Sequence, residues 1–152
     1  MGRMIRYFAS MLPLPLSWRA PLYRLSGMKI GAQVTIDRNL QVTAPDHIRI
    51  GDRVTIANAV SILGNITTVN SRLGEAFDVE KTAEVVIEDD AYIGVKATIL
   101  PGIRIGRMAT VSANTLVTSN VPDYAVMVGV PGRIFLVRGQ PDDEADNPES
   151  AE

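Results

Sequence analysis

The chain has 152 residues, a length that suits one domain. Its formal net charge of −2 argues against a general nucleic-acid binder, because such proteins carry a strong positive excess. The absence of cysteine excludes disulfide bonds and cysteine-ligated zinc, and it favours a reducing, cytoplasmic environment. No run of about 18 apolar residues occurs, so no segment is predicted to span a membrane.

Residues 1–29 form a basic and apolar segment, and the first acidic side chain in the sequence is Asp37. Pro13 and Pro15 divide this segment into two expected short helices, at roughly 3–12 and 17–26. One interpretation is a helical cap that covers the open end of a repeat domain. The other is an amphipathic segment that lies on the anionic inner face of a membrane. The prolines interrupt the apolar run, which argues against a signal peptide.

A six-residue repeat begins after this segment. A period of six matches neither the α-helix nor the alternation of a strand, and it indicates short strands that end in turns of fixed shape. Twelve blocks open on a β-branched apolar residue, namely Ile30, Ile36, Val42, Ile50, Ile56, Ile62, Ile87, Ile93, Ile99, Ile105, Val111 and Val117. If each block forms one side of a triangular coil, successive coils stack at the strand spacing of about 4.8 Å.

The repeat therefore predicts an all-β fold, a parallel β-helix whose block-opening side chains fill a narrow prism. The fifth residue of each block also suits the interior, at Val34, Leu40, Val54, Val60, Ile66, Ala91, Ala97, Ile103, Ala109, Thr115 and Val121. Gly94 and Gly106 occupy second positions, where we expect glycine to permit unusual backbone angles at the corner.

Two interruptions break the period. The block from Val42 is two residues too long near Pro45 and Asp46, which predicts a bulged corner. Residues 68–84 are polar and accommodate no block, and a loop of this length inside a compact repeat is usually functional. After Val121 we expect a turn and a small terminal element, followed by a disordered acidic tail over 139–152.

Over Ile30 to Arg138 the chain resembles the hexapeptide-repeat acyltransferases. The blocks themselves, ILPGIRIG at 99–106 and GVPGR at 129–133 carry the resemblance. The branch most similar is that of the sugar O-acetyltransferases, which includes galactoside, maltose and exopolysaccharide acetyltransferases. The resemblance implies a left-handed β-helix and a homotrimer. It also implies acetyl-CoA (acyl-CoA) bound between subunits, a saccharide acceptor beneath the long loop, no metal, and a role in polysaccharide biosynthesis.

The resemblance also assigns the residues that would bind CoA. Val95, Ala97 and Ala113 fall on the wall that holds the thioester. Thr118 and Ser119 align with a Thr-Lys pair that meets the nucleotide end, so the lysine of that pair is missing here. Arg133 aligns with a basic residue near the adenosine phosphate, for which a guanidinium is well suited. The alternative for Arg133 is a solvated surface arginine.

The catalytic position departs from the family pattern. In the segment ILGNITTVNSR, at 62–72, Asn65 and Thr67 stand where the family has histidines, and neither is a base at neutral pH. Loss of a general base typically lowers the rate by a factor of about 10² to 10⁴. His47, the single histidine, is either a relocated base or a surface residue beside Asp46.

The long loop offers further candidates. Glu75, Asp78 and Glu80 are possible carboxylate bases, although most charges in such loops are only solvated. The matching part of the family loop faces the acceptor, so Arg72 and Glu75 are expected to contact it. An amine acceptor would reduce the need for a base, and Asn65 could then orient the nucleophile or stabilise the oxyanion.

Two functional interpretations stay open at this point. The first is an acyl-CoA-dependent acyltransferase acting on a sugar or similar acceptor through a hydroxyl or an amine. The second is a catalytically silent trimeric scaffold that binds CoA or a partner enzyme of polysaccharide assembly. The zinc carbonic anhydrases share this coil, but they need three histidine ligands, and the sequence contains one histidine.

Overall fold

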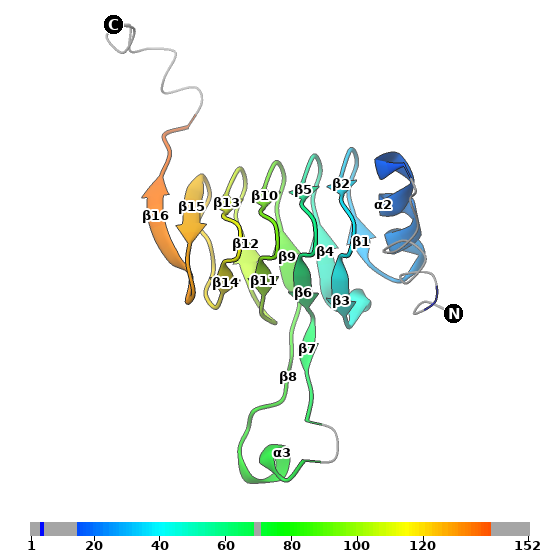
Figure 1. Cartoon of the computed structure of the whole chain (residues 1–152), viewed down its shortest axis with the longest axis vertical. Coiled ribbons are helices and arrows are strands. Elements are labelled where there is room, and N and C mark those ends of the chain that lie inside the picture. Colours follow the sequence, from blue (N-terminus) through cyan, green and yellow to red (C-terminus); the bar gives the residue numbers. More distant parts are fainter. Residues whose placement is uncertain (1–3, 5–14, 69–70, 141–152) are drawn as a thin grey trace, which may run out of the picture.

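The structure is a computed structural model that describes residue 4 and residues 15–68 and 71–140. Short strands wind into a prism with three flat faces, and successive coils stack along its axis (Figure 1). The chain visits the three faces, sheets A, B and C, in the same order in every coil. The predicted β-helix of hexapeptide repeats is therefore confirmed, and its left-handed sense stays an expectation from the resemblance.

Each face is a sheet of strands that are mostly parallel. Sheet A contains β1 (Lys29–Ile30), β4 (Ile48–Ile50), β9 (Val85–Ile87) and β12 (Arg104–Ile105). Sheet B contains β2 (Thr35–Ile36), β5 (Thr55–Ile56), β10 (Tyr92–Ile93), β13 (Thr110–Val111), β15 (Ala125–Val128) and the antiparallel β16 (Arg133–Val137). Sheet C contains β3 (Gln41–Thr43), β6 (Ser61–Leu63), β11 (Thr98–Ile99) and β14 (Leu116–Val117).

The block-opening residues stack in register inside the prism. Ile56 pairs with Ile93, and Ile93 pairs with Val111, so each opening side chain lies on that of the next coil. These three residues have no exposed surface. Burial of such a side chain contributes about 1.5–3 kcal/mol, which makes the repeated Ile and Val the main stabilising feature of the coil.

Glycine at the second position acts differently from the prediction. Gly94 and Gly106 do not have positive φ; that conformation falls on fourth-position residues such as Lys96 and Met108. A Cβ on Gly94 would lie 2.6 Å from the backbone nitrogen of Ala113 in the next coil. Glycine is needed here because neighbouring coils approach closely, and the prediction of unusual backbone angles was wrong.

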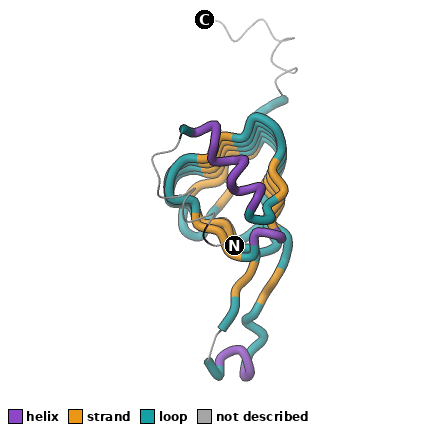
Figure 2. Tube along the Cα trace, turned by 90° about the vertical axis from the view of Figure 1, so that its right-hand side faces the viewer, coloured by secondary structure: helices purple, strands orange, loops and turns teal. Residues whose placement is uncertain are grey.

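Helix α2 (Leu16–Leu25) lies across the N-terminal end of the prism (Figure 2). Arg19, Ala20 and Tyr23 form its buried face, and the Tyr23 hydroxyl donates to the carbonyl oxygen of Leu40 at 3.2 Å. Of the helix expected over 3–12, only Met4 is described. None of the helices in the described ranges combines the length and the apolar character that crossing a membrane requires.

The two interruptions lie at the same corner, in neighbouring coils. The excess residues near Pro45 form a 3₁₀ turn, η1 (Pro45–His47). In the following coil the chain leaves the prism as an arm, made of β7 (Asn65–Ile66), α3 (Leu73–Ala76) and β8 (Lys81–Thr82) (Figure 1). Ile66 pairs with Lys81 in this arm and is only half-buried, so its predicted place in the interior was wrong.

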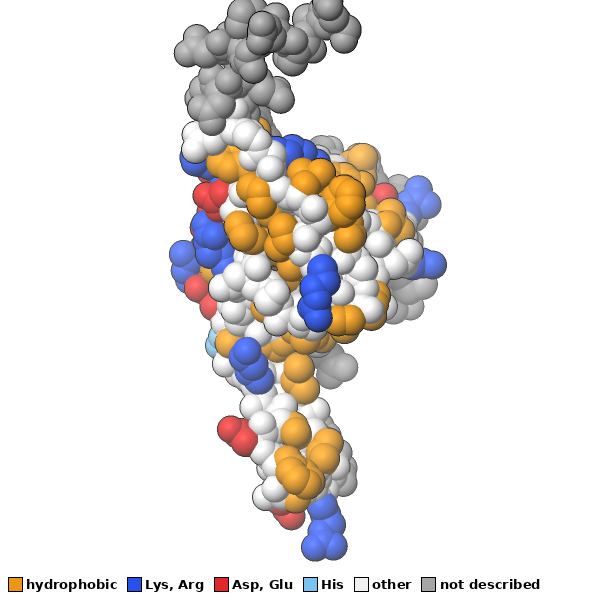
Figure 3. Space-filling model, turned by 90° about the vertical axis from the view of Figure 1, so that its left-hand side faces the viewer, with side chains coloured by type: hydrophobic (Ala, Val, Ile, Leu, Met, Phe, Trp, Pro, Cys, Tyr) orange, Lys and Arg blue, Asp and Glu red, His pale blue; other side chains and the backbone are white. Residues whose placement is uncertain are grey.

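The other end of the prism carries the small terminal element. Strand β16 runs antiparallel to β15, and each of its residues is exposed. Apolar side chains gather on this end of the molecule, where Val130, Ile134, Phe135, Leu136 and Val137 are exposed (Figure 3). The acidic tail from residue 141 onward lies outside the described residues.

Candidate functional site

The arm leaves the corner that joins sheet C to sheet A, and its root is packed between two neighbouring corners. On one side, a Cβ on Gly64 would lie 2.6 Å from the carbonyl oxygen of Ala44, the residue before η1. On the other side, a Cβ on Gly102 would lie 3.2 Å from Lys81 Nζ and from the Cβ of Ala83. Close packing on both sides fixes where the arm begins.

Asn65 and Thr67, which stand where the resemblance implies histidines, lie at this root. Asn65 is half-buried, and its carbonyl oxygen accepts a hydrogen bond from Thr43 Oγ1 at 3.1 Å. Thr67 is exposed. The backbone of Asn65 is thus held against the preceding coil, which fixes the place of this residue on the corner.

His47 ends the 3₁₀ turn of the neighbouring coil. Its side chain is 40% exposed, and Nδ1 lies 3.2 Å from Asp46 Oδ2. The sequence placed His47 one coil before the expected site. The structure adds that its turn and the root of the arm occupy the same corner, since Gly64 packs on Ala44.

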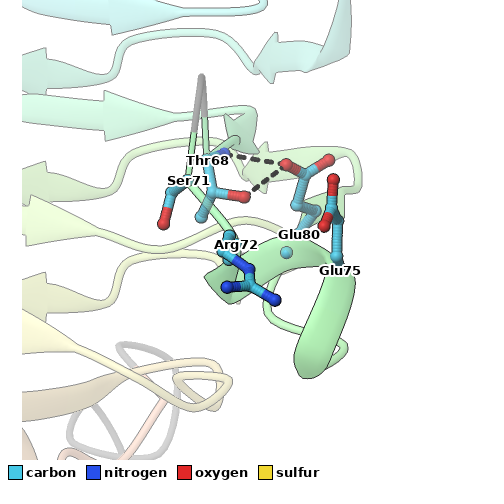
Figure 4. Close-up of a pocket in the computed structure, with 6 residues that line it drawn as sticks. Thr68, Ser71, Arg72, Glu75 and Glu80 are labelled. Carbon is cyan, nitrogen blue, oxygen red and sulfur yellow. Dashed lines mark hydrogen bonds between the residues drawn. The ribbon is translucent and has the colours of Figure 1, made fainter.

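A hollow within the arm collects several predicted residues. It is lined by Thr68, Ser71, Arg72, Gly74, Glu75 and Glu80 (Figure 4). The Glu80 carboxylate accepts hydrogen bonds from the backbone nitrogen of Thr68 at 2.8 Å and from its Oγ1 at 2.6 Å. These bonds lower the pKa of Glu80 below its ordinary value. Glu80 is therefore a weaker base than a free carboxylate, and its main role is to close the arm.

The predicted acceptor residues Arg72 and Glu75 both line this hollow. Neither forms an ion pair with another described residue, so a guanidinium and a carboxylate are available to a polar ligand there. Asp78 is exposed and does not line it. Thr68 was missed by sequence reasoning. The antiparallel pairing of Asn65 with Thr82 brings the segments that contain Thr68 and Glu80 close together. A hairpin pattern over 65–82 would have been the signal in the sequence.

Val95 and Ala113 lie on the corner that joins sheet B to sheet C, in successive coils. The Asn114 nitrogen donates to the carbonyl oxygen of Val95 at 2.8 Å, which stacks the two turns. Both side chains are exposed, and in the described part of the chain no acceptor pairs with the backbone N–H of either residue. Two backbone N–H groups on this seam therefore have no hydrogen-bond acceptor among the described residues.

Ala97 does not belong to that seam. Its side chain has no exposed surface, because it is a fifth-position residue that points into the prism. Its nitrogen donates to Gly94, and its carbonyl oxygen accepts from Ser61, so its backbone groups are also used within the coil. The assignment of Ala97 to the thioester-holding wall is corrected: it is a core residue.

The residues assigned to the nucleotide end lie near the last coil. Thr118 and Ser119 are exposed and follow directly on β14. The nitrogen of Gly132, next to Arg133, donates to the carbonyl oxygen of Leu116 in β14 at 2.8 Å. The structure thereby brings Arg133 to the strand that precedes Thr118, although 14 residues separate Thr118 from Gly132 in the sequence.

The candidate residues lie in several places. Val95 and Ala113 are at the corner between sheets B and C, Arg72 and Glu75 are in the arm, and the remaining exposed candidates are near the last coil or at the corner between sheets C and A. The described residues contain no group of three or more His, Cys, Asp or Glu side chains that could hold a metal ion. The arrangement offers backbone donors, hydroxyl groups, one amide, and a guanidinium at each of two sites.

Comparison with known proteins gives a consistent picture. Residues 84–119 match the family model described as the hexapeptide repeat of succinyl-transferase. The chain is 32% identical over 114 residues to a serine acetyltransferase of Bacillus licheniformis, covering 75% of this chain and 48% of that protein. The chain thus spans about half the length of this curated relative.

Two solved structures share the fold. One is a hexapeptide-repeat-containing acetyltransferase of Vibrio cholerae in complex with acetyl-CoA, with a TM-score of 0.73 and 24% identity over 91% of this chain and 86% of that one. The other is a galactoside acetyltransferase in complex with coenzyme A, with a TM-score of 0.69 and 21% identity over 93% and 81% of the two chains.

Proposed function

The chain carries the hexapeptide repeat and resembles the hexapeptide-repeat acyltransferases, and on that premise we propose that it transfers an acyl group from acetyl-CoA or another acyl-CoA. The acceptor is a sugar or a related small polar molecule that reacts through a hydroxyl or an amine. The observation that carries this proposal is the pair of free backbone donors on the seam, at Val95 and Ala113.

The seam suits an extended ligand with amide groups. The N–H groups of Val95 and Ala113 would donate to the amide carbonyls of pantetheine, which needs no particular side chain. Arg133, Thr118 and Ser119 lie near the final coil and would meet the phosphates at the nucleotide end. Guanidinium and hydroxyl groups are good donors to phosphate oxygens.

In the reaction, the acceptor oxygen or nitrogen attacks the carbonyl carbon of the thioester. The carbon–sulfur bond breaks, and the CoA thiolate takes up the proton that the acceptor loses. The Asn65 amide, held at the root of the arm, would orient the nucleophile or donate to the oxyanion. Arg72 and Glu75 would hold the rest of the acceptor.

The absence of an imidazole at the root of the arm favours an amine acceptor. Asn65 and Thr67 are neutral, and the Glu80 carboxylate already accepts two hydrogen bonds from Thr68. A neutral amine already carries a nucleophilic lone pair and loses its proton after the attack, whereas a hydroxyl needs help from a base. His47 would serve a hydroxyl acceptor only if its turn opened toward the arm.

The resemblance also supports a homotrimer with the CoA groove between subunits, acting in the cytoplasm in polysaccharide biosynthesis. In such an assembly the seam of one subunit faces the neighbouring subunit. Light scattering coupled to gel filtration tests the trimer directly, and a monomeric mass at assay concentration would contradict it.

The decisive experiment measures cleavage of acetyl-CoA against matched panels of amino sugars, neutral sugars and small amino compounds. We expect turnover with an amine, and a large loss of kcat in Asn65→Ala. Asn65→His restores a base at this position, so we expect it to raise the rate with hydroxyl acceptors by at least about 10-fold. Saturable CoA binding without turnover on any panel would instead support the silent scaffold.

The nucleotide end is tested separately by calorimetry with CoA. We expect Arg133→Ala to weaken CoA binding by about 10-fold, because a phosphate contact with a charged donor is lost. Arg38→Ala is the matched control, since this exposed arginine lies in the first coil at the opposite end. Equal affinities in the two variants would contradict the placement of Arg133.

A further inference from the structure

Helix α2 exposes large apolar side chains on its outer face, in addition to those that it buries against the coil. Trp18 and Leu25 are 65% and 71% exposed, whereas Arg19 and Tyr23 on the opposite side are buried against the coil. A helix of a soluble domain normally turns its apolar side chains inward and its charges outward. The outer face of α2 therefore points to a contact outside the prism.

The apolar face is continuous rather than a set of scattered residues. Trp18, Pro21 and Leu22 line a shallow groove together with Ser17, and Leu16, 50% exposed, extends the apolar surface at the start of the helix. Contiguous exposed apolar surface of this kind marks an interaction site, whereas single exposed apolar residues do not.

Exposed basic side chains accompany the C-terminal part of this face. Arg24 and Lys29 are exposed beside it, and the Arg24 side chain is held in place by donating to the carbonyl oxygens of Ile30 and Gly31. No acidic residue occurs before Asp37 in the sequence. The charge next to the apolar strand β16, at the opposite end of the prism, has the other sign, because the sequence that follows it, residues 141–152, is acidic.

We propose that the outer face of α2 docks on an anionic bilayer surface. Trp18, Leu22 and Leu25 would enter the boundary between headgroups and acyl chains, and Arg24 and Lys29 would meet anionic headgroups. A second copy of the chain is a poorer occupant, because like charges would face one another across the contact. This inference goes beyond the proposed acyl transfer and does not depend on it.

Trp18 is the only tryptophan in the sequence, so its fluorescence reports on this face alone. The full chain is mixed with vesicles of phosphatidylcholine, or of equal parts phosphatidylcholine and phosphatidylglycerol. With the anionic vesicles we expect a blue shift of the emission, co-flotation, and quenching by brominated lipid. Binding to neutral vesicles should be at least about 10-fold weaker, and added salt should lower the affinity for the anionic vesicles.

Two variants localise the contact. We expect Leu25→Glu to lower the vesicle affinity by at least about 10-fold, because it removes buried apolar area and adds a repelled charge. Phe135→Glu is the matched control, since Phe135 is 70% exposed on the opposite end. It should leave binding unchanged. Thermal unfolding by circular dichroism checks that both variants remain folded.

Three results would overturn the proposal. The first is unchanged Trp18 emission and no flotation with anionic vesicles. The second is strong protection of Trp18 from acrylamide in the free protein, which would mean that the face is already covered. The third is a halved mass of Leu25→Glu in sedimentation, which would assign the face to a contact between copies of this chain.

Discussion

The coil and the arm that leaves it are stabilised in opposite ways. In the coil, strand β10 pairs with β5 on one side and β13 on the other, and Ile93 has no exposed surface. In the arm, strands β7 and β8 pair only with each other, and Leu73 and Phe77 are 47% and 64% exposed. The coil is a rigid support, whereas the arm depends on a few exposed contacts.

This difference divides the candidate site. The proposed CoA seam at Val95 and Ala113 belongs to the coil, and the proposed acceptor residues Arg72 and Glu75 belong to the arm. Regions with few buried contacts open locally at low free-energy cost, while packed strands open only when the domain unfolds. We therefore expect the acceptor side to adjust to its ligand and the CoA side to be preformed.

The largest expected effect compares one apolar truncation in each region. Ile93→Ala removes a fully buried side chain and should lower the free energy of unfolding by about 2–5 kcal/mol. Leu73→Ala, in the arm, should change it by no more than about 0.5 kcal/mol. Urea unfolding followed by circular dichroism measures both variants. Similar losses would mean that the arm is packed as tightly as the coil.

A smaller effect is expected from closing the space between two coils. Gly94→Ala places a methyl group against the backbone of Ala113, and separating the coils there should cost about 1–3 kcal/mol. Gly139→Ala is the matched control, because no atom lies within 4 Å of a Cβ at that position. Thermal unfolding of the two variants gives the comparison, and equal midpoints would refute the packing role of Gly94.

The smallest effect concerns the pH dependence of the arm. Because hydrogen bonds from Thr68 lower the pKa of Glu80 in the folded arm, they stabilise it above the unfolded pKa. This stabilisation is lost as the pH falls through the folded pKa. The protection of the Thr68 amide from exchange, measured relative to the intrinsic rate at each pH, should therefore fall in acid. Glu80→Gln should remove the pH dependence, and an unchanged acid response in that variant would exclude Glu80 as its source.

Sequence reasoning succeeded wherever the repeat applied and failed where the chain left it. Ile93 and Val111 were placed correctly, because a branched apolar residue at every sixth position has only the prism interior to occupy. Ile66 keeps the same spacing and yet lies in the arm. The six-residue period describes the preference of each short segment. It does not show whether the chain continues into the next strand of the coil or leaves it, as it does at Ile66.

The glycines show a related limit. Gly51 and Asp89 are 38 residues apart, yet a Cβ on Gly51 would lie 2.8 Å from the backbone nitrogen of Asp89. Glycine is required by a neighbour one coil away, which no local pattern displays. Ala97 is a different case, because its fifth position in the block already predicted burial and only the resemblance assigned it to the CoA wall.

By itself the sequence determined the coil, because each block carries its own strand, corner and interior side chain, and identical units can only stack. It also shows that Asn65 and Thr67 stand where the resemblance implies histidines. Only the tertiary structure decided which groups share a corner with Asn65 and that Thr68 binds Glu80. Those contacts join residues from different coils or opposite sides of the arm, and their spacing depends on where the coil is interrupted.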